Sequence, residues 1–112
     1  MRIVGTLEAR EAPNPHDVSA RGLHSAKHVQ GSTVTLKAGE ALKRHVTPVD
    51  VFFYVLEGEG FVEIGDEREA VSANMLIDSP ARVPHRLLNE SDADFRFLVV
   101  KPPRPTRATK VL

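Results

Sequence analysis

The sequence contains no cysteine among its 112 residues. This absence excludes disulfide scaffolds, zinc sites built from thiolates and thiol nucleophiles. An excess of either charge is also missing, because 15 Lys and Arg residues balance 15 Asp and Glu residues. We therefore expect neither nucleic acid nor an acidic membrane surface as a partner of this chain.

Long hydrophobic runs are lacking as well. The longest strongly apolar run extends from Val51 to Leu56, whereas a bilayer-spanning helix needs about 20 apolar residues. The first ten residues contain no apolar core of a secretory signal. These features predict a soluble, cytoplasmic protein, and 112 residues are enough to build one hydrophobic core.

No stretch shows sustained helical periodicity. Short apolar, β-branched runs alternate instead with Gly, Pro, Asn and Asp, which predicts an all-β sandwich or barrel. Glycine supplies the positive φ of tight turns, so Gly58-Glu59 and Gly65-Asp66 predict two β-hairpins. The predicted strands are Lys27–Lys37, Leu42–Val46, Asp50–Glu57, Gly60–Ile64, Glu67–Val71, Asn74–Asp78, His85–Asn89 and Phe95–Lys101.

The chain divides into an N-terminal segment (1–25), a barrel (26–101) and a tail (102–112). The tail region KPPRPTRATK has three prolines and the bases Lys101, Arg104, Arg107 and Lys110, without an acid. Proline removes backbone donors and excludes a helix or a central strand. We expect an extended arm that is either solvated or in contact with a neighbouring subunit.

The segment 50–57 is apolar on both faces. One parity holds Val51, Phe53 and Val55, and the other holds Phe52, Tyr54 and Leu56. A strand with one wet face would alternate between apolar and polar residues. The outer face is therefore expected to be covered, either by a second copy in a homodimer or by the chain's own N-terminal segment or tail.

Two segments carry histidines at spacings that resemble the cupin superfamily. Its first motif, G-x5-H-x-H-x3-E-x6-G, is matched in spacing by Gly39, His45, Thr47, Val51 and Gly58. Its second motif, G-x5-P-x-G-x2-H-x3-N, is matched in spacing by Asn74, Pro80, Arg82, His85 and Asn89. The resemblance covers roughly Val34 to Lys101, which is most of the chain.

The resemblance implies a small single-domain cupin of the conserved-barrel type. Its fold would be a single antiparallel jelly-roll barrel, or double-stranded β-helix, which is commonly dimeric. Metal-binding cupins use two His and one Glu of the first motif with the His of the second. Here Thr47 replaces one His and Val51 replaces the Glu, so that only His45 and His85 remain.

Asp50 offers a substitute carboxylate. It has the wrong parity in a regular strand, but Pro48 marks a place where a bulge would shift that parity. His45, His85 and Asp50 would then form a two-His, one-carboxylate metal site for Fe, Mn, Ni or Zn. The alternative places Asp50 outward beside Lys43 or Arg44, and the two imidazoles would then hold a divalent ion weakly or not at all.

These observations predict a small-molecule-binding cupin with a partly altered metal site. Thr47, Val51 and Phe53 are the expected cavity-lining residues, and no catalytic residue is assigned. A metal-dependent oxygenase or isomerase that uses His45 and His85 is the alternative, and a purely structural partner is a third possibility. The remaining histidines are interpreted as loop or surface residues, namely His16, His24 and His28.

Overall fold

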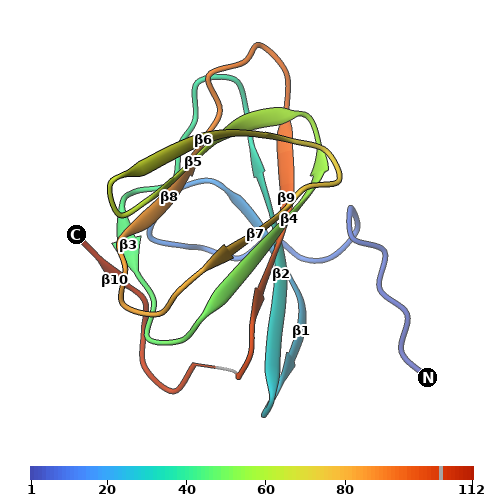
Figure 1. Cartoon of the computed structure of the whole chain (residues 1–112). Helices are drawn as coiled ribbons and strands as arrows, with labels where there is room; N and C mark the ends of the chain where they lie inside the picture. The colour runs from blue at the N-terminus through green and yellow to red at the C-terminus, as the bar shows by residue number, and fades with distance from the viewer. Residues whose placement is uncertain (104) are drawn as a thin grey trace.

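Ten strands form two antiparallel sheets in a computed structural model that describes residues 1–103 and 105–112 (Figure 1). Within the described residues there is no helix long and apolar enough to cross a membrane. The strands are β1 (Ser19–Ala26), β2 (Val29–Leu36), β3 (His45–Val46), β4 (Val51–Glu57), β5 (Glu59–Ile64), β6 (Glu67–Ser72), β7 (Leu76–Ser79), β8 (His85–Leu88), β9 (Phe95–Lys101) and β10 (Lys110–Val111).

The two sheets face each other and enclose the core. One sheet has the order β1-β2-β9-β4-β7 and the other β10-β3-β8-β5-β6. Alternate side chains of the long strands point inward, as the pleat of a strand dictates. The most deeply buried apolar side chains are Leu36, Val55, Leu87, Phe95 and Phe97. The predicted all-β jelly-roll barrel is therefore confirmed.

All eight predicted strands overlap strands of the structure, and two further strands are present. Strand β1 pairs with β2, and β10 pairs with β3. Neither was predicted, because SARGLHSA has no alternating apolar pattern and β10 is only two residues long. The N-terminal segment and the tail thus each contribute one strand to the sheets.

One of the two predicted hairpins is wrong. Strand β4 pairs with β7 and β9, whereas β5 pairs with β6 and β8, so the chain passes from one sheet to the other at Gly58. Gly58 has the predicted positive φ of 82°, and a Cβ there would collide with the Asp94 carbonyl. The hairpin at Gly65-Asp66 is confirmed, since Ile64 pairs with Glu67.

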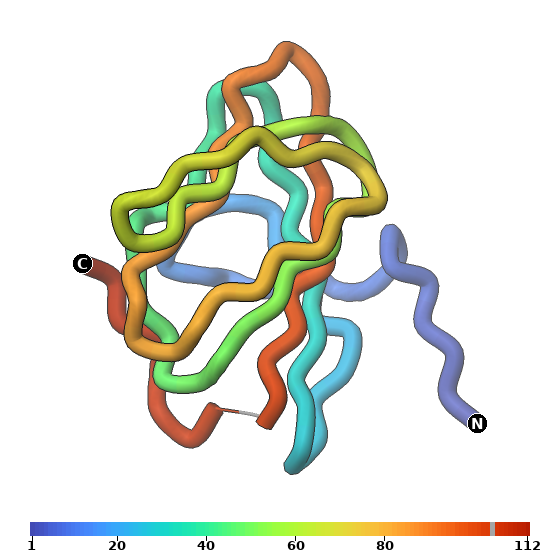
Figure 2. Tube along the Cα trace, viewed as in Figure 1, coloured from blue at the N-terminus to red at the C-terminus, as the bar shows by residue number. Residues whose placement is uncertain are grey.

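The last described segment returns to the barrel. Figure 2 shows the chain leaving β9, turning beyond the end of that strand and coming back to β3. Arg104, one of the bases predicted to make the tail an arm, lies outside the described residues. The tail is therefore anchored at its end by the pairs Lys110 with Val46 and Val111 with His45.

Candidate functional site

His45 and His85 lie side by side because their strands pair in register. His45 of β3 is the cross-strand partner of His85 of β8, which places both side chains on the same face of the sheet. They point into the barrel and are only 5% and 1% exposed. The two Nε2 atoms are 3.0 Å apart, and the Phe53 ring stands edge-on to the His85 ring at 5.5 Å.

The hydrogen bonds of the two rings fix their protons. The Lys43 carbonyl lies 2.6 Å from His45 Nδ1 and can only accept, so this nitrogen carries the proton. His45 Nε2 then has a free lone pair, and His85 Nε2–H donates to it across 3.0 Å. The Ser79 hydroxyl in turn donates to His85 Nδ1 at 2.7 Å. The result is a directed chain from Ser79 through both imidazoles to the Lys43 carbonyl.

Both imidazoles are neutral at physiological pH. Burial lowers the pKa of His85 to about 3, with the nearby His45 as the second cause. Burial also lowers the pKa of His45, although the Lys43 carbonyl acts in the opposite direction by accepting its hydrogen bond. Neutrality agrees with the hydrogen-bond chain, which needs one lone pair and one proton at the contact between the rings.

His16 joins this pair, a contact that the sequence interpretation missed. The segment before β1 places the His16 ring 4.5 Å from the His45 ring, centroid to centroid. The Lys43 backbone N–H donates to His16 Nδ1 at 2.9 Å, so the ring proton sits on Nε2. Burial and the neighbouring His45 lower its pKa to about 4. No local sequence signal predicts a contact between residues that belong to separate loops and strands.

A cavity of about 180 Å³ opens beside the three rings. Its wall combines side chains from both sheets with the segment before β1. Most of the wall is apolar, and the polar exceptions are the three imidazoles, an ammonium group, an amide and two hydroxyls. The lining residues are Asn14, Pro15, His16, Val18, Ala20, Ser32, Val34, Leu42, His45, Val51, Phe53, His85, Val99, Lys101 and Thr109.

Two of the three residues predicted to line the cavity do so, namely Val51 and Phe53. Thr47 does not line it, and its buried Oγ1 has no hydrogen-bond partner among the described residues. Asp50 is exposed, and its carboxylate accepts a hydrogen bond of 2.8 Å from the Ala81 backbone N–H. It fixes the loop before β8 instead of facing the two imidazoles.

These donors do not fit the metal centre of a metal-binding cupin. Two imidazole nitrogens are in place, but no third His, Asp or Glu completes a metal-binding group within the part of the chain that is described. His16 keeps its proton on Nε2 while Nδ1 accepts from Lys43, so neither nitrogen offers a lone pair. Lys101 adds a positive charge to the wall of the cavity, which disfavours a cation beside it. Whether His45, His85 and Asp50 bind a metal stays a prediction.

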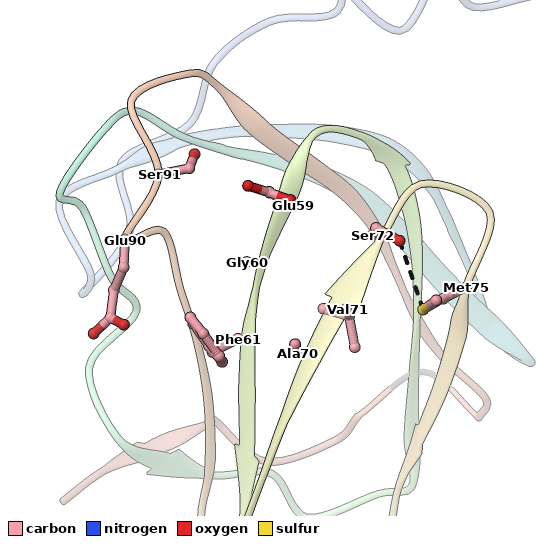
Figure 3. A pocket seen from close by; sticks show the side chains of 9 residues that line it. All are labelled: Glu59, Gly60, Phe61, Ala70, Val71, Ser72, Met75, Glu90 and Ser91. Carbon is pink, nitrogen blue, oxygen red and sulfur yellow. Dashed lines mark hydrogen bonds between the residues drawn. The ribbon is translucent and has the colours of Figure 1, made fainter.

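A second hollow lies on the outside of the barrel, over β5 and β6 (Figure 3). It measures about 370 Å³ and is more open than the cavity. Its residues include two carboxylates but no histidine, and Ser72 donates to the Met75 sulfur. The lining is Glu59, Gly60, Phe61, Ala70, Val71, Ser72, Met75, Glu90 and Ser91. The inner cavity gathers three imidazoles and an ammonium group, so it is the stronger candidate site.

Known proteins resemble the chain in sequence and in fold. A family model described as a cupin domain matches residues 32–101. The protein TT1209 from Thermus thermophilus is 33% identical, with a TM-score of 0.81 over 94% of this chain and 100% of that one.

Two further solved structures share the fold at lower identity. The polyketide cyclase RemF from Streptomyces resistomycificus is 20% identical, with a TM-score of 0.85 over 100% of this chain and 85% of its own. A double-stranded β-helix protein from Klebsiella pneumoniae is 17% identical, with a TM-score of 0.84 over 99% and 96% of the two chains. No curated protein matches the sequence.

Proposed function

The chain belongs to the cupin domain family, and from this premise we propose that its barrel binds a small organic molecule without the help of a metal ion. One observation carries this proposal. The two remaining histidines are hydrogen-bonded to each other at 3.0 Å beside a largely apolar cavity of about 180 Å³. Largely apolar cavities with a few convergent polar groups are the usual sites of small ligands.

The chemistry of the wall supports binding over metal catalysis. The imidazole pair satisfies its own donors and acceptors through Ser79 and the Lys43 carbonyl. It therefore needs no ion to compensate buried polar atoms. Apolar side chains such as Val34, Leu42 and Val99 supply the contact surface, and removing apolar ligand surface from water contributes roughly 25 cal/mol per Å².

The test uses neutral probes of the cavity's size. Benzamide and benzyl alcohol are titrated into the ¹⁵N-labelled chain with and without a chelator, and amide shifts are followed by NMR. We expect the shifts to gather at cavity residues such as Ala20 and Val99, unchanged by the chelator. Failure of both probes to perturb these residues at millimolar concentration contradicts the proposal.

A filled cavity provides the matched control. Ala20 lines the cavity and Ala26 does not, although both lie half-buried in β1. Ala20→Leu should abolish the benzamide shifts, whereas Ala26→Leu should preserve them. Benzamide shifts that persist unchanged in Ala20→Leu place the probe elsewhere and contradict cavity binding.

A metal-dependent enzyme of the oxygenase or isomerase type is the second candidate. Two nitrogens bound about 2.1 Å from one ion at a right angle are about 3 Å apart, and the His45–His85 Nε2 separation of 3.0 Å matches this. Elemental mass spectrometry of natively purified protein decides between the two. A stoichiometric Fe, Mn, Ni or Zn that is lost in both His45→Gln and Asp50→Asn supports the enzyme; a metal-free protein contradicts it.

A further inference from the structure

Lys101 brings an ammonium group into the cavity wall without a carboxylate partner. It is the last residue of β9 and is half-buried. Its Nζ has one side-chain contact, with the Thr109 hydroxyl at 3.5 Å. None of the ion pairs within the described residues includes Lys101. Burial lowers the pKa of Lys101, as expected for a partly desolvated cation.

The groups around Lys101 cannot neutralise it. Lys101 lines the same cavity as His16, His45 and His85. Burial is the main cause of the lowered pKa of each imidazole, and the positive charge of Lys101 is a smaller one. Neutral imidazoles carry no negative charge, and the remaining wall is apolar, amide or hydroxyl. A desolvated charge without a counter-charge is destabilising. A ligand that carries a negative group would compensate the charge of Lys101.

Two more polar groups can assist at the same wall. His16 carries its ring proton on Nε2, because Nδ1 accepts from the Lys43 N–H. Ser32 of β2 also lines the cavity, and its hydroxyl makes no side-chain hydrogen bond within the described part of the chain. Both are donors, and so is the Lys101 ammonium. A wall that offers several donors and no acidic group suits an anion.

The volume of the cavity and its apolar lining indicate the uncharged part of the ligand. An apolar protein cavity of about 150 Å³ holds one benzene molecule, and this one measures about 180 Å³. Apolar side chains make up most of the wall, among them Leu42, Val51 and Phe53. The cavity therefore has room for one ring or one short branched chain that bears a single charged group.

We propose that the ligand of this barrel is a small monocarboxylic acid with a compact apolar body. Its carboxylate would lie against Lys101, with His16 and Ser32 as further donors, and its body against the apolar wall. This inference rests on the proposed function, since it names the chemical class of the molecule that the cavity binds. If the proposal is right, the cavity binds an anion more tightly than a neutral molecule of the same shape.

Benzoate and benzamide test the proposal, because they match in shape and differ in charge. Isothermal titration calorimetry of the full chain at neutral pH should give a dissociation constant at least about tenfold lower for benzoate, the size of one charge-assisted interaction. Equal affinities, or tighter binding of benzamide, overturn the carboxylate assignment and leave small-molecule binding intact. Binding of neither probe at millimolar concentration overturns both.

Variants of Lys101 then locate the charge effect. Lys101→Gln should weaken benzoate about tenfold and change benzamide less than about twofold, whereas Lys101→Arg should keep the preference. The control is Lys27→Gln, which removes the same charge from the exposed turn between β1 and β2. A benzoate preference that survives in Lys101→Gln, or that disappears in Lys27→Gln, overturns the role of Lys101. The Arg variant keeps the test decisive if the Gln variant does not fold.

Discussion

At the scale of single residues, Ser79 satisfies the buried acceptor nitrogen of His85. Its buried hydroxyl donates to His85 Nδ1, which leaves the proton on Nε2 for the contact with His45. Ser79→Ala should leave this nitrogen without a partner and lower the free energy of unfolding by about 1–3 kcal/mol. Urea unfolding measures the loss, and the ¹⁵N shifts of the His85 ring report the tautomer. The exposed Ser25→Ala is the control; equal stability of both variants would contradict the directed chain.

Single residues also show how far spacing predicts a site. His45 and His85 were predicted together because the resemblance to cupins places both at ligand positions, and the structure pairs them directly. His16 and Lys101 were not, because their contacts depend on how the N-terminal segment and the end of β9 meet in space. The partner of Asp50 could not be predicted, because a carboxylate in a loop can accept hydrogen bonds from several backbone N–H groups. In the structure it accepts one from the Ala81 N–H.

At the scale of strands, Gly60 of β5 allows the two sheets to approach. A Cβ at Gly60 would collide with the Phe95 ring of β9 and come within 2.6 Å of the Leu88 carbonyl of β8. Gly60→Ala should therefore lower the free energy of unfolding by about 1–3 kcal/mol or more, as overpacking does. The control is Gly31→Ala in β2, where nothing lies within 4 Å of the added Cβ. Chemical denaturation of both variants checks this, and equal midpoints would refute it.

Strand pairing explains which elements the sequence could predict. The strands β4 and β9 are short apolar runs rich in aromatic and β-branched residues, so they could be predicted from the sequence. Strand β1 is polar and takes its place through backbone pairing with β2. The Gly58 turn looked like a hairpin because positive φ is a local property, whereas the choice of the next sheet depends on contacts distant in sequence.

At the scale of the whole molecule, the outer face of the sheet that contains β4 suggests a dimer. Tyr54 has Leu76 and Leu98 as its cross-strand neighbours, and Leu76 is 54% exposed. We propose a second copy as the cover, because a two-fold interface sets the same apolar face against itself. Light scattering after size exclusion should give twice the chain mass, and Leu98→Lys should halve it. Ala70→Lys, exposed on the other sheet, is the control; a monomeric parent chain contradicts the proposal.

The buried His45 and His85 and the half-buried His16 also make the stability of the whole fold depend on pH. In the unfolded chain they titrate near 6.5, whereas in the fold the pKa of His85 is lowered to about 3, that of His16 to about 4, and that of His45 is lowered as well. Below pH 6.5 the unfolded state therefore binds more protons, and stability falls as the solution is acidified.

As the pH falls below about 6.5, each of these histidines becomes protonated in the unfolded chain but stays neutral in the fold. Each should then lower the free energy of unfolding by up to about 1.4 kcal/mol for every further unit of pH. Urea unfolding between pH 7 and pH 5 measures this slope in a range where carboxylates stay ionised. His85→Gln should reduce the slope by about one histidine's share, because a glutamine does not titrate. His28→Gln, which removes an exposed imidazole, is the matched control. A slope near zero in the parent chain would mean that the imidazoles take up protons without unfolding the barrel.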